Sequence, residues 1–148
     1  MNFDGASKGN PLTASYGGVV RNSKGFIMGV FWGSIGTSTN NGTELEGMIF
    51  GMEWAIQKNW SPIIIEGDSL LIITMAKRLQ AGSLEGKLSM NWHLESKLRA
   101  LCIILEANHG VVFLHVKFYV NKFFDSISNK GVLATSTFLA FSWHDLQN

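Results

Sequence analysis

The sequence predicts an α/β fold in which helices flank a mixed, five-stranded sheet. Short runs rich in β-branched and aromatic residues alternate with stretches in which apolar residues recur every three to four positions. Hydrophobic residues make up 46% of the chain and charged residues 16%, which is typical of a protein with a packed core. Because 148 residues correspond to about one domain, we expect a single domain over residues 1–148.

Three strands are predicted in the first part of the chain. The first ends at Asp4, and the next two, over residues 15–21 and 26–32, are joined by a turn at Asn22–Gly25. This arrangement is typical of an antiparallel hairpin. Residues 34–42 are rich in Ser, Thr, Gly and Asn, which predicts a polar loop after the hairpin.

The clearest helix is predicted over residues 44–59, where apolar side chains repeat with the helical period. Its N-terminus offers several candidate caps. Thr43 and Glu46 match a capping box, whereas Thr39 or one of the two asparagines after it could cap the helix instead.

A further strand is predicted at Ile63–Ile65, shortly before Asp68. Its continuous β-branched run is typical of a central strand that is buried on both faces. The remaining expected elements are helices over residues 69–79 and 94–107, separated by a loop over 82–90, then a strand over 111–118 and a helix from Lys122 onward.

Charge and cysteine content limit the classes of function. The net charge is only +1, so any contact with a polyanion must be local. The single cysteine, Cys102, cannot form an internal disulfide or a zinc cluster. Residues 25–43 are uncharged, but their Gly, Ser, Thr and Asn content argues against a membrane span. Without an export signal, we expect an intracellular protein, nuclear or cytoplasmic, that is neither secreted nor membrane-bound.

Four acidic residues lie at the ends of predicted elements. Asp4 follows the first strand, Asp68 closes the strand that begins at Ile63, and Glu44 and Asp125 lie at helix starts. Carboxylates at such places can meet at one edge of an α/β sheet, where their hard oxygen ligands suit Mg²⁺. The alternative is local: helix caps or first-turn acids at Asp68 and Asp125, and a solvated helix residue at Glu44.

The residues around these acids match, in order, the motifs of a known family. The matching segments are Asp4–Pro11, Gly17–Gly25, Thr39–Leu45, Glu66–Ser69, His115–Val116 and Asn121–Gly131. They resemble type 1 ribonuclease H domains, and most of all the reverse-transcriptase-like ribonuclease H domains of plants, many of which are associated with non-LTR retrotransposons. The resemblance extends over about residues 3–131 and includes all four acids, each within its own motif.

The resemblance implies a ribonuclease H-like fold and a metal-dependent endonuclease that hydrolyses the RNA strand of RNA–DNA hybrids. Two Mg²⁺ ions would act in this reaction, and Mn²⁺ could substitute for them. The implied catalytic and metal-binding residues are Asp4, Glu44, Asp68 and Asp125.

The resemblance also implies how the hybrid is contacted. Asn10, Asn40 and Asn41 lie where the family touches its substrate, although turn and cap chemistry also explains asparagine at these positions. We further expect a monomeric domain that forms part of a larger reverse-transcriptase-type protein.

Several residues depart from the family. Phe118 and Tyr119 replace the usual Arg–Glu pair, and Phe124 occupies a position that is usually Ala. The alternative to a nuclease is therefore a catalytically impaired domain that acts as a nucleic-acid-binding or structural module. His115 lies within a predicted strand, which favours a structural role over proton shuttling. Residues 132–148 are expected to form a C-terminal tail or helix.

Overall fold

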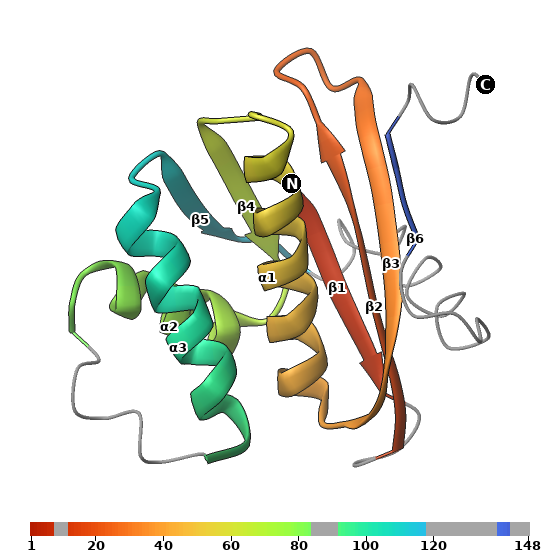
Figure 1. Ribbon diagram of the computed structural model, residues 1–148, viewed down its shortest axis with the longest axis vertical. Helices are drawn as coiled ribbons and strands as arrows, with labels where there is room; N and C mark the ends of the chain where they lie inside the picture. The colour runs from red at the N-terminus through yellow and green to blue at the C-terminus, as the bar shows by residue number, and fades with distance from the viewer. Residues whose placement is uncertain (8–11, 84–91, 118–138, 143–148) are drawn as a thin grey trace.

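Residues 1–7, 12–83, 92–117 and 139–142 are described by the computed structural model. The strands in these residues form one sheet with the order β5-β4-β1-β2-β3-β6, in which β1, β4 and β5 are parallel and the other neighbours are antiparallel (Figure 1). The predicted α/β fold with a mixed sheet is confirmed. Its elements are β1 (Asn2–Ser7), β2 (Leu12–Arg21), β3 (Ile27–Ser38), α1 (Asn40–Gln57), β4 (Ile63–Gly67), α2 (Leu70–Gln80), α3 (Trp92–Ala107), β5 (Val111–His115) and β6 (Leu139–Ser142).

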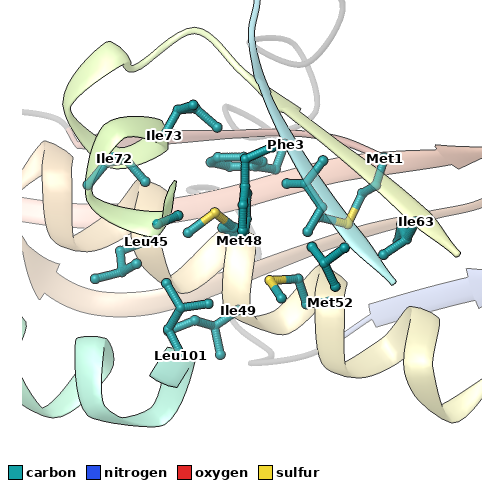
Figure 2. Close-up of a cluster of buried hydrophobic side chains, with 14 of the residues drawn as sticks. Met1, Phe3, Leu45, Met48, Ile49, Met52, Ile63, Ile72, Ile73 and Leu101 are labelled. Atoms are coloured by element: carbon teal, nitrogen blue, oxygen red, sulfur yellow. The ribbon is translucent and has the colours of Figure 1, made fainter. Parts of the chain in front are cut away.

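The three described helices pack together over one face of the sheet. α1 lies across β1, β2 and β3, α2 contacts β4 and β5, and α3 contacts both other helices (Figure 1). Within the described residues, no helix is both long enough and apolar enough to cross a membrane. Figure 2 shows the core between sheet and helices, in which Phe3, Leu45, Met48, Met52 and Leu101 are each less than 2% exposed.

Several strands, among them β1 and β3, extend further than the sequence predicts. β1 continues past Asp4 to Ser7, because it pairs with β2 residue by residue as far as the Ser7–Ala14 pair. β3 continues to Ser38, so most of the loop expected over residues 34–42 is strand. Its Gly, Ser and Thr residues are weak strand formers that the ladder to β2 holds in extended conformation.

Two element ends also differ from prediction. α1 begins at Asn40 rather than at Glu44, and β5 ends at His115, short of the predicted Phe118. Within the segment expected to be a tail or helix, Leu139–Ser142 instead form β6, which pairs with β3. This pairing satisfies backbone groups at the edge of β3, an interaction that the local sequence does not reveal.

The strand β4 is buried on one face only. Ile63 and Ile65 are 7% and 0% exposed, whereas Ile64 is 51% exposed. Its neighbour across the β4–β5 ladder, Val112, is also 51% exposed. The prediction of burial on both faces is therefore wrong, because the described helices cover the face toward which Ile63 and Ile65 point.

Candidate metal centre

Asp4 lies in β1, and Asp68 directly follows β4, the parallel neighbour of β1. Asn2 of β1 lies opposite Glu66 of β4, and the Asn2 side chain donates a 2.7 Å hydrogen bond to Glu66 Oε2. The Glu66 N–H also donates to the Met1 carbonyl at 2.8 Å. Because alternate residues of a strand share a face, Asp4 and Asp68 follow this pair on the same side of the two strands.

The first turn of α1 is capped by Thr39. Its side chain accepts a hydrogen bond from the Gly42 N–H at 3.1 Å, and its carbonyl accepts one from Thr43 Oγ1 at 2.7 Å. Of the caps that the sequence allows, the structure selects Thr39, so the Thr43–Glu46 capping box is not formed. Because the helix begins at Asn40, Glu44 lies on its second turn.

A glycine allows α1 to approach β1 closely. A Cβ atom added to Gly5 would lie 2.6 Å from the backbone nitrogen of Glu44 and 2.8 Å from the carbonyl carbon of Thr43. The neighbouring Asp4 carboxylate accepts a hydrogen bond from the Gly5 N–H at 2.8 Å. The absence of a side chain at Gly5 therefore brings Glu44 beside Asp4.

Three of the four predicted acids lie close together. Asp4, Glu44 and Asp68 each offer one carboxylate oxygen, and these three oxygens lie within 4.8 Å of one another. Asp4 is 5% exposed, and the other two side chains are half-buried. Oxygen ligands of this number, charge and spacing suit a hard divalent cation such as Mg²⁺.

The arrangement of the three acids disfavours the ionised form of Glu44. Burial and, to a lesser extent, the charge of Asp68 raise the pKa of Glu44 to about 8, against which a hydrogen bond with the Ser69 side chain acts. Glu44 Oε2 is buried and has no hydrogen-bond partner among the described residues. A cation would pair with this oxygen and stabilise the charged carboxylates, so the donor set fits a metal ion.

The model of the family described as reverse transcriptase-like matches residues 2–100, a span that contains all three clustered acids. The chain belongs to the reverse transcriptase-like family. Among its relatives is a protein of Arabidopsis thaliana provisionally named a ribonuclease H protein, which is 32% identical over 146 residues. The alignment covers 99% of this chain but 22% of that protein, so the chain spans about a fifth of its relative's length.

Solved structures share the fold of this family member. Ribonuclease H1 of the archaeon Halobacterium salinarum has a TM-score of 0.76 at 29% identity, over 88% of this chain and 94% of that one. The LC11 ribonuclease H1, isolated from compost and solved in complex with an RNA/DNA hybrid, has a TM-score of 0.74 at 25% identity, over 88% and 94% of the two chains. The chain thus has the ribonuclease H fold.

Two contacts near the clustered acids of this reverse transcriptase-like chain were not predicted from its sequence. Ser69 interacts with Glu44, and its Oγ accepts a hydrogen bond from the Ile72 N–H at 3.3 Å, which caps α2. A serine directly before an apolar helical repeat is a cap signal that could have identified this residue. The His115 Nε2 lies 3.1 Å from the Asp68 carbonyl oxygen, a contact across 47 positions without a local sequence signal.

The predicted substrate-binding asparagines lie partly within the structure. Asn40 and Asn41 are the first two residues of α1; Asn40 is exposed and Asn41 is half-buried. They therefore share the helix end that carries Glu44. The other predicted site residues and the residues that depart from the family, Asp125, Asn10, Phe118, Tyr119 and Phe124, lie outside the described residues.

A cavity of about 390 Å³ lies beside the start of α1. Its lining includes polar groups from Thr37 and Ser38 of β3, from Thr39 before α1, and from Lys97 of α3. Lys97 forms an ion pair with Glu46 of α1. Hydroxyl groups and a cation thus line the surface next to the two asparagines.

Proposed function

We propose that this chain is a metal-dependent endonuclease that hydrolyses the RNA strand of RNA–DNA hybrids. The observation that carries the proposal is the cluster of Asp4, Glu44 and Asp68, built from three separate elements on a ribonuclease H fold. The LC11 relative was solved with an RNA/DNA hybrid, which supports this class of substrate.

Mg²⁺ is the proposed cofactor, with two ions bound and Mn²⁺ as a substitute. A divalent cation held by Asp4, Glu44 and Asp68 would supply Lewis acidity for the attack of water on the phosphodiester. Asp4 contributes a negative oxygen from within β1, Asp68 one from directly after β4, and Glu44 a third from α1. Asp125 is proposed as the fourth ligand.

The protein's own contribution is to hold these groups in place. The β1–β4 pairing and the Gly5 contact with α1 fix the three carboxylates before substrate arrives, so little reorganisation is needed during the reaction. Asn40, Asn41 and Asn10 are proposed to hydrogen-bond the hybrid. RNA would be distinguished from DNA by contacts to its 2′-hydroxyl groups.

A further part of the proposal concerns a larger protein to which this chain would belong. We propose that it acts as a monomeric domain of a larger reverse-transcriptase-type protein. The family match and the small share of the Arabidopsis relative that the chain covers support its being part of a larger protein.

The first test is cleavage of a labelled RNA–DNA hybrid in Mg²⁺, beside single-stranded RNA, duplex RNA and duplex DNA. We expect cuts in the RNA strand of the hybrid alone. Binding of the hybrid without any cut, in Mg²⁺ and in Mn²⁺, would instead show a nucleic-acid-binding module. Cleavage of single-stranded RNA at an equal rate would contradict the proposed substrate.

Two variants link this activity to the cluster. Asp68→Asn removes a ligand charge without changing the side-chain shape, and we expect cleavage to fall by more than about 100-fold, beyond the range typical of residues that only support a ligand. Glu53→Gln makes the same chemical change on an exposed face of α1 and should leave cleavage unchanged. Equal melting temperatures of the variants would show that the loss is not caused by unfolding.

A further inference from the structure

We infer that His115 is a positioning residue of the metal centre, whose imidazole holds the backbone of Asp68 so that the Asp68 carboxylate stays in the cluster. This inference rests on the proposed function in one respect, that the cluster binds a divalent cation. His115 itself is not among the clustered ligands of the described residues.

Asp68 lies one residue beyond the ladder that joins β4 to β5. The paired residues run from Ile63 opposite Val111 to Gly67 opposite His115. After them, the Val116 N–H donates a 2.9 Å hydrogen bond to the Gly67 carbonyl. The backbone of β5 therefore secures β4 as far as Gly67, the residue before the metal ligand.

The His115 side chain extends this connection by one residue. Its Nε2 lies 3.1 Å from the Asp68 carbonyl oxygen. A carbonyl can only accept, so Nε2 carries the proton and donates it to this bond. The imidazole therefore holds the Asp68 peptide group through this bond, which is the contact expected of a positioning residue.

The chain is constrained on both sides of Asp68. Before it, a Cβ atom on Gly67 would lie 2.6 Å from the Phe3 ring, so β4 packs directly against this core side chain. After it, Ser69 caps α2, and the Ser69 carbonyl accepts a 3.0 Å hydrogen bond from the Ile73 N–H. Asp68 is the single residue between these two anchored positions, and His115 fixes its peptide group from the side of β5.

Support of this kind is what a metal ligand requires. Residues that orient a ligand typically change metal affinity or activity by about 10–100-fold when they are removed. An exposed histidine at the end of an edge strand contributes little to the core, so its removal should affect the ligand more than the fold.

The test compares Mn²⁺ binding, measured by isothermal titration calorimetry, across four variants. His115→Phe and His115→Ala remove the donor, and we expect each to weaken Mn²⁺ binding by roughly 10-fold. His115→Gln restores an N–H donor and should stay within about threefold of the wild-type affinity. His109→Gln changes an exposed histidine two residues before β5 begins, away from Asp68, and should bind Mn²⁺ as the wild type does.

The outcomes separate positioning from the alternatives. Wild-type affinity in folded His115→Phe or His115→Ala would overturn the inference, and so would a His115→Gln variant that binds as weakly as His115→Ala. Hybrid cleavage is measured on the same samples. A wild-type chain that binds Mn²⁺ but cuts no hybrid would contradict the proposed function alone, whereas one that binds no cation would overturn both.

Discussion

The pKa of Glu44 is raised to about 8, first by burial and then by the charge of Asp68. Below this pH, the metal-free protein keeps Glu44 protonated, although an ordinary glutamate would be ionised. A divalent cation reverses the preference, because it pairs with the carboxylate. Metal binding at neutral pH should therefore release a proton from Glu44, and the affinity for the metal should rise as the pH approaches about 8.

The same shift predicts how stability depends on pH. Above the ordinary pKa of 4.5 the unfolded chain loses a proton that folded Glu44 retains until about pH 8, so the free energy of unfolding of the metal-free protein falls across this interval. Moving the pKa of Glu44 from 4.5 to about 8 corresponds to a contribution of at most about 5 kcal/mol. Urea denaturation in EDTA, repeated across the interval, measures it.

The isosteric variant Glu44→Gln serves as the control for this prediction. It cannot ionise, so the part of the pH dependence that comes from Glu44 should disappear and the variant should exceed the wild type in stability above about pH 8. Its Mg²⁺ binding should be weakened because a ligand charge is lost. Identical stability profiles for the wild type and Glu44→Gln would contradict the raised pKa.

At the scale of elements, the distance between β1 and α1 is set by Gly5. In Gly5→Ala the new methyl group would meet backbone atoms of Thr43 and Glu44, which cannot move without displacing the helix. We expect a loss of roughly 1–3 kcal/mol in unfolding free energy and a weaker affinity for Mn²⁺. Denaturation and calorimetric titration measure the two effects.

A second glycine separates the loss of stability from the loss of the site. Gly25 has a φ of +84° in the turn between β2 and β3, and nothing lies within 4 Å of a Cβ atom added there. Gly25→Ala should therefore lower stability through backbone strain while leaving Mn²⁺ affinity unchanged. If Gly5→Ala bound Mn²⁺ as tightly as Gly25→Ala, the close approach at Gly5 would not be what brings Glu44 to Asp4.

The elements that sequence predicts well are those whose signal is local. The periodic apolar residues of α1 and of α2 lie within the elements they define. The extension of β3 to Ser38 and the pairing of β6 depend on hydrogen bonds to distant strands. Such contacts override the weak strand propensity of Gly and Ser, so the predicted boundaries at these places are wrong.

At the scale of the whole molecule, the sequence indicated the acids of the site but not their geometry. Asp4, Glu44 and Asp68 could be proposed together because their motifs resemble one family, and the structure shows what unites them: the β1–β4 pairing and the approach of α1. The contact of His115 with Asp68 depends on strand order, which places β5 beside β4. Local patterns do not contain this information.

The measurement that tests the metal centre most directly is anomalous X-ray diffraction from crystals grown with Mn²⁺, compared with crystals of Asp4→Asn. We expect an anomalous peak within about 2.0–2.6 Å of carboxylate oxygens from Asp4, Glu44 and Asp68, and its loss or marked weakening in the variant. Mn²⁺ bound at other places while these three carboxylates remain without a peak would contradict the account.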